Sequence, residues 1–133
     1  MFQQRMAIEI STRQAGDVTI LDISGRMVGV SEGQKIHTAM TAEYEQGHHW
    51  LLLNCGGLTF IDSSGLGDVV AAHVAIIRLG GVARILDPRG TATDALVRTR
   101  LSLLLDIFSE EAAALASFNE ADNRRTREKL AGV

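Results

Sequence analysis

Apolar and polar residues follow one another along the first half of the chain in patterns that predict strands and a helix. Residues 6–11 alternate between apolar and polar, which predicts a half-buried strand. Turn residues at 14–17 separate it from a second predicted strand at 18–23, so an antiparallel hairpin is expected. The spacing Ser31-Glu32-Gly33-Gln34 is that of a capping box and predicts a helix from about Ser31, which Gly47 is placed to end.

The middle of the chain predicts a strand, a helix and a second strand in succession. The continuous apolar run at 50–53 indicates a central strand buried on both faces, and residues 59–61 lead from it to Asp62. A helix is then expected until Gly80-Gly81, with one apolar stripe at positions 66, 69, 70, 74 and 77. Residues 82–86 form the next predicted strand, so this order implies a right-handed parallel crossover.

The last third of the chain carries weaker patterns. Thr91 or Thr93 can cap a further helix, whose expected apolar side consists of Leu96, Val97 and Leu101. Residues 104–108 can form a last strand. Ser109 is expected to cap a helix that continues over 112–118.

The segment at 120–129 is mixed in charge and nearly free of apolar residues, which indicates either a solvated helical extension or a frayed tail. We therefore expect one α/β domain at residues 1–118 and a charged C-terminal tail or helix extension at 119–133. A chain of 133 residues with 46% hydrophobic residues can bury the core of one such domain without disulfides or metals.

Charge and composition exclude several classes of partner. The net charge of -3 argues against a general nucleic-acid-binding protein, because phosphate contacts require a clustered basic face. No apolar run approaches the about 20 residues that span a membrane, and the first ten residues lack the apolar stretch of a secretory signal. The single cysteine, Cys55, permits no internal disulfide. A cytoplasmic location without direct nucleic-acid or membrane contacts is expected.

The turn Asp62-Ser63-Ser64-Gly65-Leu66-Gly67 is the strongest candidate for chemistry, because a helix N-terminus with unsatisfied N–H groups suits an anion. A dinucleotide fingerprint is disfavoured, since Val70 stands where its third glycine would be. A hydrolase elbow is disfavoured too, because Ile61 and Asp62 replace the glycine two residues before either serine. The simplest structural alternative is that Ser63 or Ser64 only caps the helix, which contributes about 1 kcal/mol.

The histidines and the cysteine do not form a recognisable metal or catalytic site. His48 and His49 are adjacent, so on a strand they point to opposite faces and cannot chelate one ion together. His73 is expected to be a partly buried core histidine with one hydrogen bond, and Cys55 a small buried residue at a strand end. We therefore expect no enzymatic activity, no metal and no cofactor for this chain.

The segment Leu58–Gly67 reads Leu-Thr-Phe-Ile-Asp-Ser-Ser-Gly-Leu-Gly and resembles the signature of the STAS family, specifically the bacterial anti-sigma factor antagonists. The likeness extends over about residues 6–118, including Ile20–Arg26, Gly80-Gly81 and the segments Thr99–Leu101 and Asp106–Phe108. The resemblance implies a single α/β domain with a mixed four- to five-stranded sheet flanked by about four helices. This agrees with the elements that the residue pattern predicts.

The resemblance also implies a function. In that family the first serine after the aspartate is phosphorylated by an anti-sigma factor that is itself a serine kinase. That position is Ser63 here, with Ser64 the less favoured neighbour, and the partner is expected to contact the whole turn from Asp62 to Gly67. The unphosphorylated antagonist binds the kinase and releases a sigma factor, and a phosphatase resets the cycle. ATP and magnesium belong to the kinase.

One segment departs from the family pattern. An acidic residue that many members carry before the first helix would fall on Val28, in a region that contributes to the partner surface. An alternative function is therefore a STAS scaffold, or an accessory subunit of a multiprotein or transport assembly, that is not switched by phosphorylation. A third class, a small hydrolase, predicts turnover of generic esters that is lost in Ser63→Ala.

Overall fold

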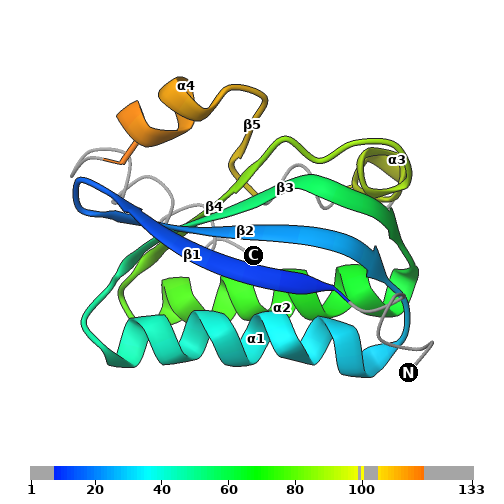
Figure 1. Ribbon diagram of the computed structural model, residues 1–133, viewed down its shortest axis with the longest axis horizontal. Helices are drawn as coiled ribbons and strands as arrows, with labels where there is room; N and C mark the ends of the chain where they lie inside the picture. Colours follow the sequence, from blue (N-terminus) through cyan, green and yellow to red (C-terminus); the bar gives the residue numbers. More distant parts are fainter. Residues whose placement is uncertain (1–7, 99, 101–104, 119–133) are drawn as a thin grey trace.

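Five strands form one mixed sheet whose order in space, β1-β2-β3-β4-β5, follows their order in the chain (Figure 1). The computed structural model describes residues 8–98, 100 and 105–118. The first two strands are antiparallel and all other neighbours are parallel. The strands are β1 (Glu9–Ala15), β2 (Val18–Met27), β3 (Trp50–Ile61), β4 (Val82–Leu86) and β5 (Ile107–Phe108).

Helices cover both faces of this sheet. Figure 1 shows α1 (Val30–Glu45) and α2 (Ser63–Arg78) side by side beneath it, and α3 (Thr91–Arg98) and α4 (Glu111–Ala116) above it. The described part of the chain thus confirms the predicted α/β fold with a mixed sheet and four helices. The hairpin of β1 and β2 and the parallel crossover from β3 through α2 to β4 are confirmed as well.

The predicted strands are present, but the ends of two of them differ from the predicted ends. The first strand begins at Glu9 and continues to Ala15, because its pairing with β2 extends to the turn at Gly16; Met6 and Ala7 lie outside the described residues. The third strand continues through Gly56-Gly57 to Ile61, with two register shifts against β2. Pairing with a long neighbour therefore extends both strands beyond their apolar runs.

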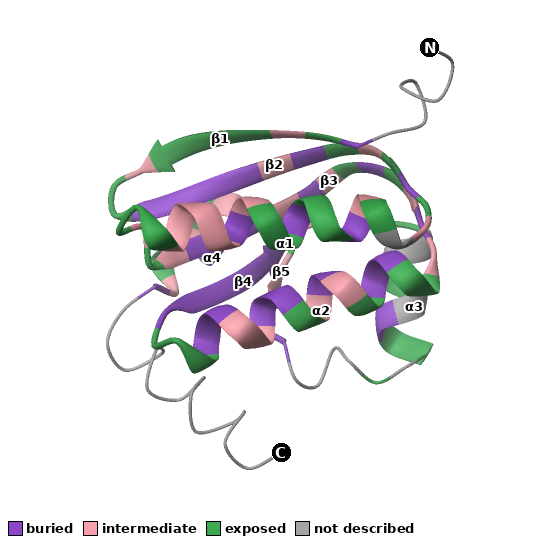
Figure 2. Ribbon diagram, turned by 90° about the horizontal axis from the view of Figure 1, so that it is seen from below, coloured by how far each residue is buried: buried purple, intermediate pink, exposed green. Residues whose placement is uncertain are grey.

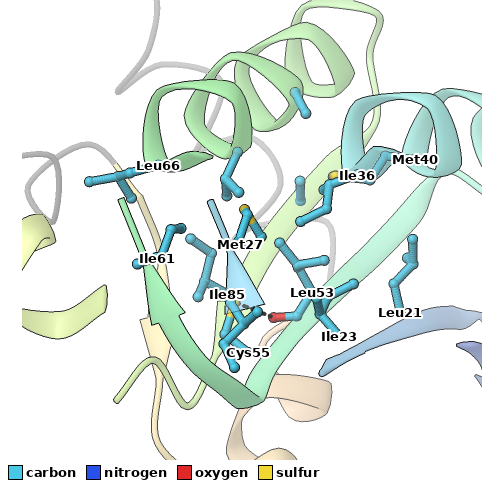
Figure 3. Close-up of a cluster of buried hydrophobic side chains, with 14 of the residues drawn as sticks. Leu21, Ile23, Met27, Ile36, Met40, Leu53, Cys55, Ile61, Leu66 and Ile85 are labelled. Atoms are coloured by element: carbon cyan, nitrogen blue, oxygen red, sulfur yellow. Dashed lines mark hydrogen bonds between the residues drawn. The ribbon is translucent and has the colours of Figure 1, made fainter. Parts of the chain in front are cut away.

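The core has two layers, one on each face of the sheet. The larger cluster joins the sheet to α1 and α2 and includes Ile23, Met27, Ile36, Met40 and Leu53 (Figure 3). A smaller cluster on the other face packs α4 against residues such as Ile20 and Leu52. Figure 2 shows the consequence, since β2 and β4 are largely buried whereas β1 is largely exposed.

Two helix faces differ from their predicted apolar sides. In α2, Val70 and Val74 are only half-buried, while Ala72, His73 and Ile76 are buried instead. The buried face is thus shifted around the helix, because α2 packs on both the sheet and α1. In α3, Leu96 is buried but Val97 is 64% exposed, so its predicted place on the apolar side is wrong. Leu101 lies outside the described residues.

Two predicted helix caps are wrong, although α1 begins at Val30, one residue from the expected start. Gly29 is the N-cap of α1, so Ser31 lies inside the helix, and the carboxylate of Glu32 accepts the Ile8 N–H at 2.8 Å. The N-cap of α4 is Glu110 rather than Ser109, and this helix ends at Ala116. The predicted helix ends are more accurate, since Gly47 and Gly80 follow α1 and α2 with φ angles of 98° and 102°.

At the start of α2, the structural alternative of a serine cap is wrong, because neither Ser63 nor Ser64 is the cap. Asp62 is the N-cap, and its Oδ1 accepts the Gly65 N–H at 2.8 Å. Its Oδ2 accepts the Gly29 N–H, also at 2.8 Å, so one carboxylate joins the starts of α1 and α2. These hydrogen bonds to the ionised form lower the pKa of Asp62 below its ordinary value.

We predict that Asp62→Ala lowers the free energy of unfolding by about 1–3 kcal/mol at neutral pH, because it removes a cap and leaves two N–H groups without their acceptor. A group whose pKa is lowered by folding stabilises the protein above its ordinary pKa of about 4 and loses this effect as the pH falls through its folded value. The difference between wild type and variant should therefore shrink in acid, as measured by urea unfolding. Ser63→Ala is the control, and an equal loss of stability there would contradict Asp62 as the cap.

Candidate functional site

The candidate site is the turn that connects β3 to α2. The chain leaves the sheet after Ile61, where the Asp62 N–H still donates to the Met27 carbonyl of β2 at 3.1 Å. Helix α2 begins with the next residue, Ser63. The positive end of the α2 dipole therefore lies at the carboxyl ends of two neighbouring parallel strands, β2 and β3.

Both serines of the turn are exposed to solvent. Ser63 and Ser64 are the first two residues of α2, and Asp62 already supplies the cap. The helix start therefore does not require either hydroxyl. An exposed hydroxyl beside a helix N-terminus is accessible to an enzyme that modifies it.

Gly65 and Leu66 lie beneath this surface. A Cβ atom on Gly65 would come within 2.9 Å of Met27 Cγ and 3.0 Å of its sulfur, so the glycine allows α2 to pack closely on β2. Leu66 is 4% exposed and belongs to the large core cluster with Met27 and Ile61 (Figure 3). Of the predicted partner-binding residues, these two position the turn, and the rest reach its surface.

Gly67 is exposed, and no structural requirement for glycine is found there. A Cβ atom added to it would meet nothing within 4 Å among the described residues, and its φ angle is not positive. Glycine inside a helix is less favourable than alanine by about 0.5–1 kcal/mol. Gly67 is four residues after Ser63, so the two share one helix face. No side chain of residue 67 thus covers the α2 backbone next to the Ser63 hydroxyl.

Asp68 adds a carboxylate on the other side of the turn. It follows Ser64 by four residues and packs against Gly33 of α1, where an added Cβ would lie 2.5 Å from the Asp68 side chain. Its Oδ2 is buried and has no hydrogen-bond partner in the described part of the chain. The two serines thus have different surroundings, since Ser64 shares its helix face with a carboxylate and Ser63 with a bare glycine.

Three residues beside the turn add to its surface, and of these the sequence had pointed only to Val28. The Arg26 guanidinium lies 5.1 Å from the centre of the Phe60 ring, and the two residues are paired across β2 and β3. Val28, already noted as a departure from the family pattern, is 44% exposed and precedes the Gly29 that binds Asp62. Knowledge of the register between β2 and β3 would have placed Arg26 and Phe60 here.

His48 and His49 are engaged with two residues of α1. His48 Nδ1 lies 2.7 Å from a Glu43 carboxylate oxygen, whereas the His49 ring stacks on Tyr44 at 4.2 Å. Each ring therefore has its own partner. No group of three histidine, cysteine or acidic side chains in the described part of the chain is arranged to hold a metal ion.

His73 and Cys55 are core residues. His73 is fully buried, not partly, and its two ring nitrogens lie 3.0 Å and 3.4 Å from the carbonyls of Val69 and Arg84. A neutral imidazole has one N–H, so it donates to one of the two carbonyls, which agrees with the prediction of one hydrogen bond. Burial lowers the pKa of His73, which keeps the ring neutral. Burial also raises the pKa of the Cys55 thiol to about 12, which leaves it unreactive, and its predicted burial is confirmed.

Solved structures with the same fold include several anti-sigma factor antagonists. One from Mycobacterium paratuberculosis is 14% identical, with a TM-score of 0.74, over 86% of this chain and 96% of that one. SpoIIAA, a cell fate determinant of Bacillus, is 18% identical in its phosphorylated form, with a TM-score of 0.64, over 84% of this chain and all of that one. Its unphosphorylated form, also 18% identical, gives a TM-score of 0.65 over 80% of this chain and 93% of that one. At these identities the likeness shows a shared fold.

No curated protein matches the sequence. Among the described residues, no helix is both long and apolar enough to cross a membrane. The model of the STAS domain family, in contrast, matches residues 9–114, which include the whole sheet, the Asp62–Gly67 turn and most of α4. The chain therefore belongs to the STAS domain family.

Proposed function

We propose that this chain is an anti-sigma factor antagonist that is switched by phosphorylation of Ser63. The observation that carries the proposal is the exposed Ser63 hydroxyl at the start of α2, which the fold does not use because Asp62 caps the helix. The membership of the STAS family and the fold shared with antagonists, one of them solved with and without phosphate, support it.

The proposed partner is an anti-sigma factor that is also a serine kinase. The Ser63 oxygen attacks the γ-phosphorus of ATP bound by that partner with magnesium, the bond to the β-phosphate oxygen breaks, and ADP leaves. A phosphatase hydrolyses the phosphoserine. This chain is then the substrate and a binding partner in the cytoplasm, and it supplies no catalytic group or cofactor.

Charge explains how one phosphate can release the partner. A phosphoserine at position 63 adds about -1.5 to -2 charges at neutral pH, next to the Asp62 carboxylate. The positive end of the α2 dipole stabilises the added negative charge by about 0.3–1 kcal/mol. A new like-charge contact across the interface at about 6 Å costs about 3 kcal/mol at an effective dielectric constant near 20, which is a loss of about a hundredfold in affinity. The switch therefore needs no change of fold.

The surroundings of the two serines favour Ser63 as the acceptor. A phosphate on Ser64 would lie on the same helix face as Asp68, and the two negative groups would repel each other. A phosphate on Ser63 faces Gly67 instead, where no side chain blocks the approach of a kinase. Ser63 thus combines open access with the lower electrostatic cost on its own helix face.

We predict that the protein isolated from its own cells carries phosphate on Ser63, as detected by phosphopeptide mass spectrometry. Ser63→Ala should abolish the modification and retain the partner in pull-downs, while Ser63→Asp should weaken that binding by at least tenfold. Ser64→Ala is the matched control and should be phosphorylated and bound like wild type. Phosphate only on Ser64, or capture of transporter or scaffold proteins without a kinase, would refute the switch at Ser63.

We also predict opposite effects of Gly67→Ala on stability and on binding. The variant should be more stable than wild type by about 0.5–1 kcal/mol, because alanine suits a helix interior and meets no neighbour here. Its affinity for the kinase should fall, because the added methyl group separates the partner from the α2 backbone. Thermal unfolding and titration of the kinase measure the two effects.

Ala71→Gly is the control for Gly67→Ala. Ala71 is exposed one turn further along the same face of α2, so this change should reduce the stability by a similar amount and leave the affinity unchanged. Equal affinity of Gly67→Ala and wild type would show that the partner does not approach the α2 backbone at this point.

A further inference from the structure

Among residues 8–98, 100 and 105–118, strand β1 forms one edge of the sheet and has β2 as its single neighbour (Figure 1). Its seven residues pair with β2 in one unbroken register, from Glu9 opposite Ser24 to Ala15 opposite Val18. Figure 2 shows the strand exposed along most of its length. The other edge strand, β5, has only two residues. β1 therefore offers the longer row of unpaired backbone groups.

Natural proteins usually protect a long edge with charged side chains, lysine above all, with proline, or with a bulge or an inward charge. The charged side chains of β1 are Glu9 and Arg13. β1 contains neither proline nor lysine, and the register shifts of the sheet lie between β2 and β3 rather than here. Its one cation, Arg13, is held by the carboxylates of Asp22 and Glu111, at 2.7 Å each. The edge is thus open to pairing with another strand.

The turn into β2 determines which backbone groups point outward. Gly16 has a φ angle of 61° and begins a two-residue turn, so Ala15 and Val18 form its closing hydrogen-bonded pair. In an antiparallel pair such bonds recur at every second residue. Because Ala15 is in a hydrogen-bonded pair, this alternation directs the N–H and C=O groups of Gln14, Thr12 and Ile10 away from β2. These three residues form what we call the β1 edge.

We propose that the β1 edge pairs with the β1 edge of a second copy of this chain, antiparallel and about a two-fold axis at Ser11. In this register Ile10 hydrogen-bonds with Thr12 of the other copy, and Glu9 lies opposite its Arg13, so the opposite charges meet twice. The two sheets join into one of ten strands.

The Arg13 side chain can accept this additional partner. A guanidinium group has five N–H donors, and four of the Arg13 donors reach Asp22 and Glu111. The remaining donor, on Nη1, has no recorded partner among the described residues. Glu9 of the second copy supplies a carboxylate for it, and repulsion from the carboxylates of Asp22 and Glu111 keeps this contact weak. Centring the pair on Thr12 instead would place Arg13 opposite Ser11 and leave Glu9 opposite Ala15, without this charge pair.

The dimer leaves the Asp62–Gly67 turn accessible, since β2 separates β1 from β3 in the sheet. It therefore does not depend on phosphorylation of Ser63. The contact is small for a protein interface, so we expect a weak, reversible dimer with a dissociation constant of about 10 µM to 1 mM.

Sedimentation equilibrium of the full chain tests the proposal. The mass should rise with concentration from 14.3 kDa towards twice that value. Thr12→Pro removes an N–H of the β1 edge without removing a bond to β2, so it should weaken the dimer at least tenfold while thermal unfolding stays close to wild type. Ser11→Ala keeps the backbone and should dimerise normally. A constant monomer mass up to about 1 mM would overturn the proposal.

Cysteine cross-linking tests the register. In Ser11→Cys the two new thiols are directly opposite at a Cα separation of about 4.5 Å, which suits a disulfide. In Thr12→Cys they are about 7–8 Å apart, which does not. Mild oxidation should therefore cross-link the first variant, and neither the second nor wild type, whose Cys55 is buried. Cross-linking of Thr12→Cys alone, or a dimer that Thr12→Pro does not weaken, would overturn the proposed pairing.

Discussion

The Asp62 carboxylate connects the two helix starts on which the surface around Ser63 depends. One of its oxygens accepts the Gly65 N–H and the other accepts the Gly29 N–H, so α1 and α2 begin at a fixed distance from each other. The same residue is still tied to the sheet through the Met27 carbonyl. Because the aspartate supplies the cap, Ser63 is free of a structural role.

Close packing at two glycines also determines where α1 and α2 lie. Gly65 allows α2 to lie against Met27, and Gly33 allows α1 to approach Asp68. A side chain at Gly65 would push α2 away from the sheet, and one at Gly33 would push α1 away from α2. Gly67 is different, because a side chain there would meet only solvent. Two glycines of this region are thus explained by the fold, and the third is not.

Local patterns predicted the main elements well, because each such pattern depends on neighbouring residues. The alternation before Gly16, the apolar run at 51–53 and the helix-ending Gly47 and Gly80 all correspond to observed features. Helix caps were predicted poorly. The spacing at Ser31 matches a capping box, but the cap is Gly29, whose N–H donates to Asp62, 33 residues further along the chain.

For the site, the chain alone determined that two hydroxyls and a carboxylate stand where a strand gives way to a helix, since this follows from residue order. Which of them caps the helix, which glycines are packed and which serine faces a carboxylate depended on contacts between distant segments. Gly29 with Asp62, Gly33 with Asp68 and Arg26 with Phe60 are examples. Such pairs exist only once strand register and helix packing are set, and no local pattern encodes them.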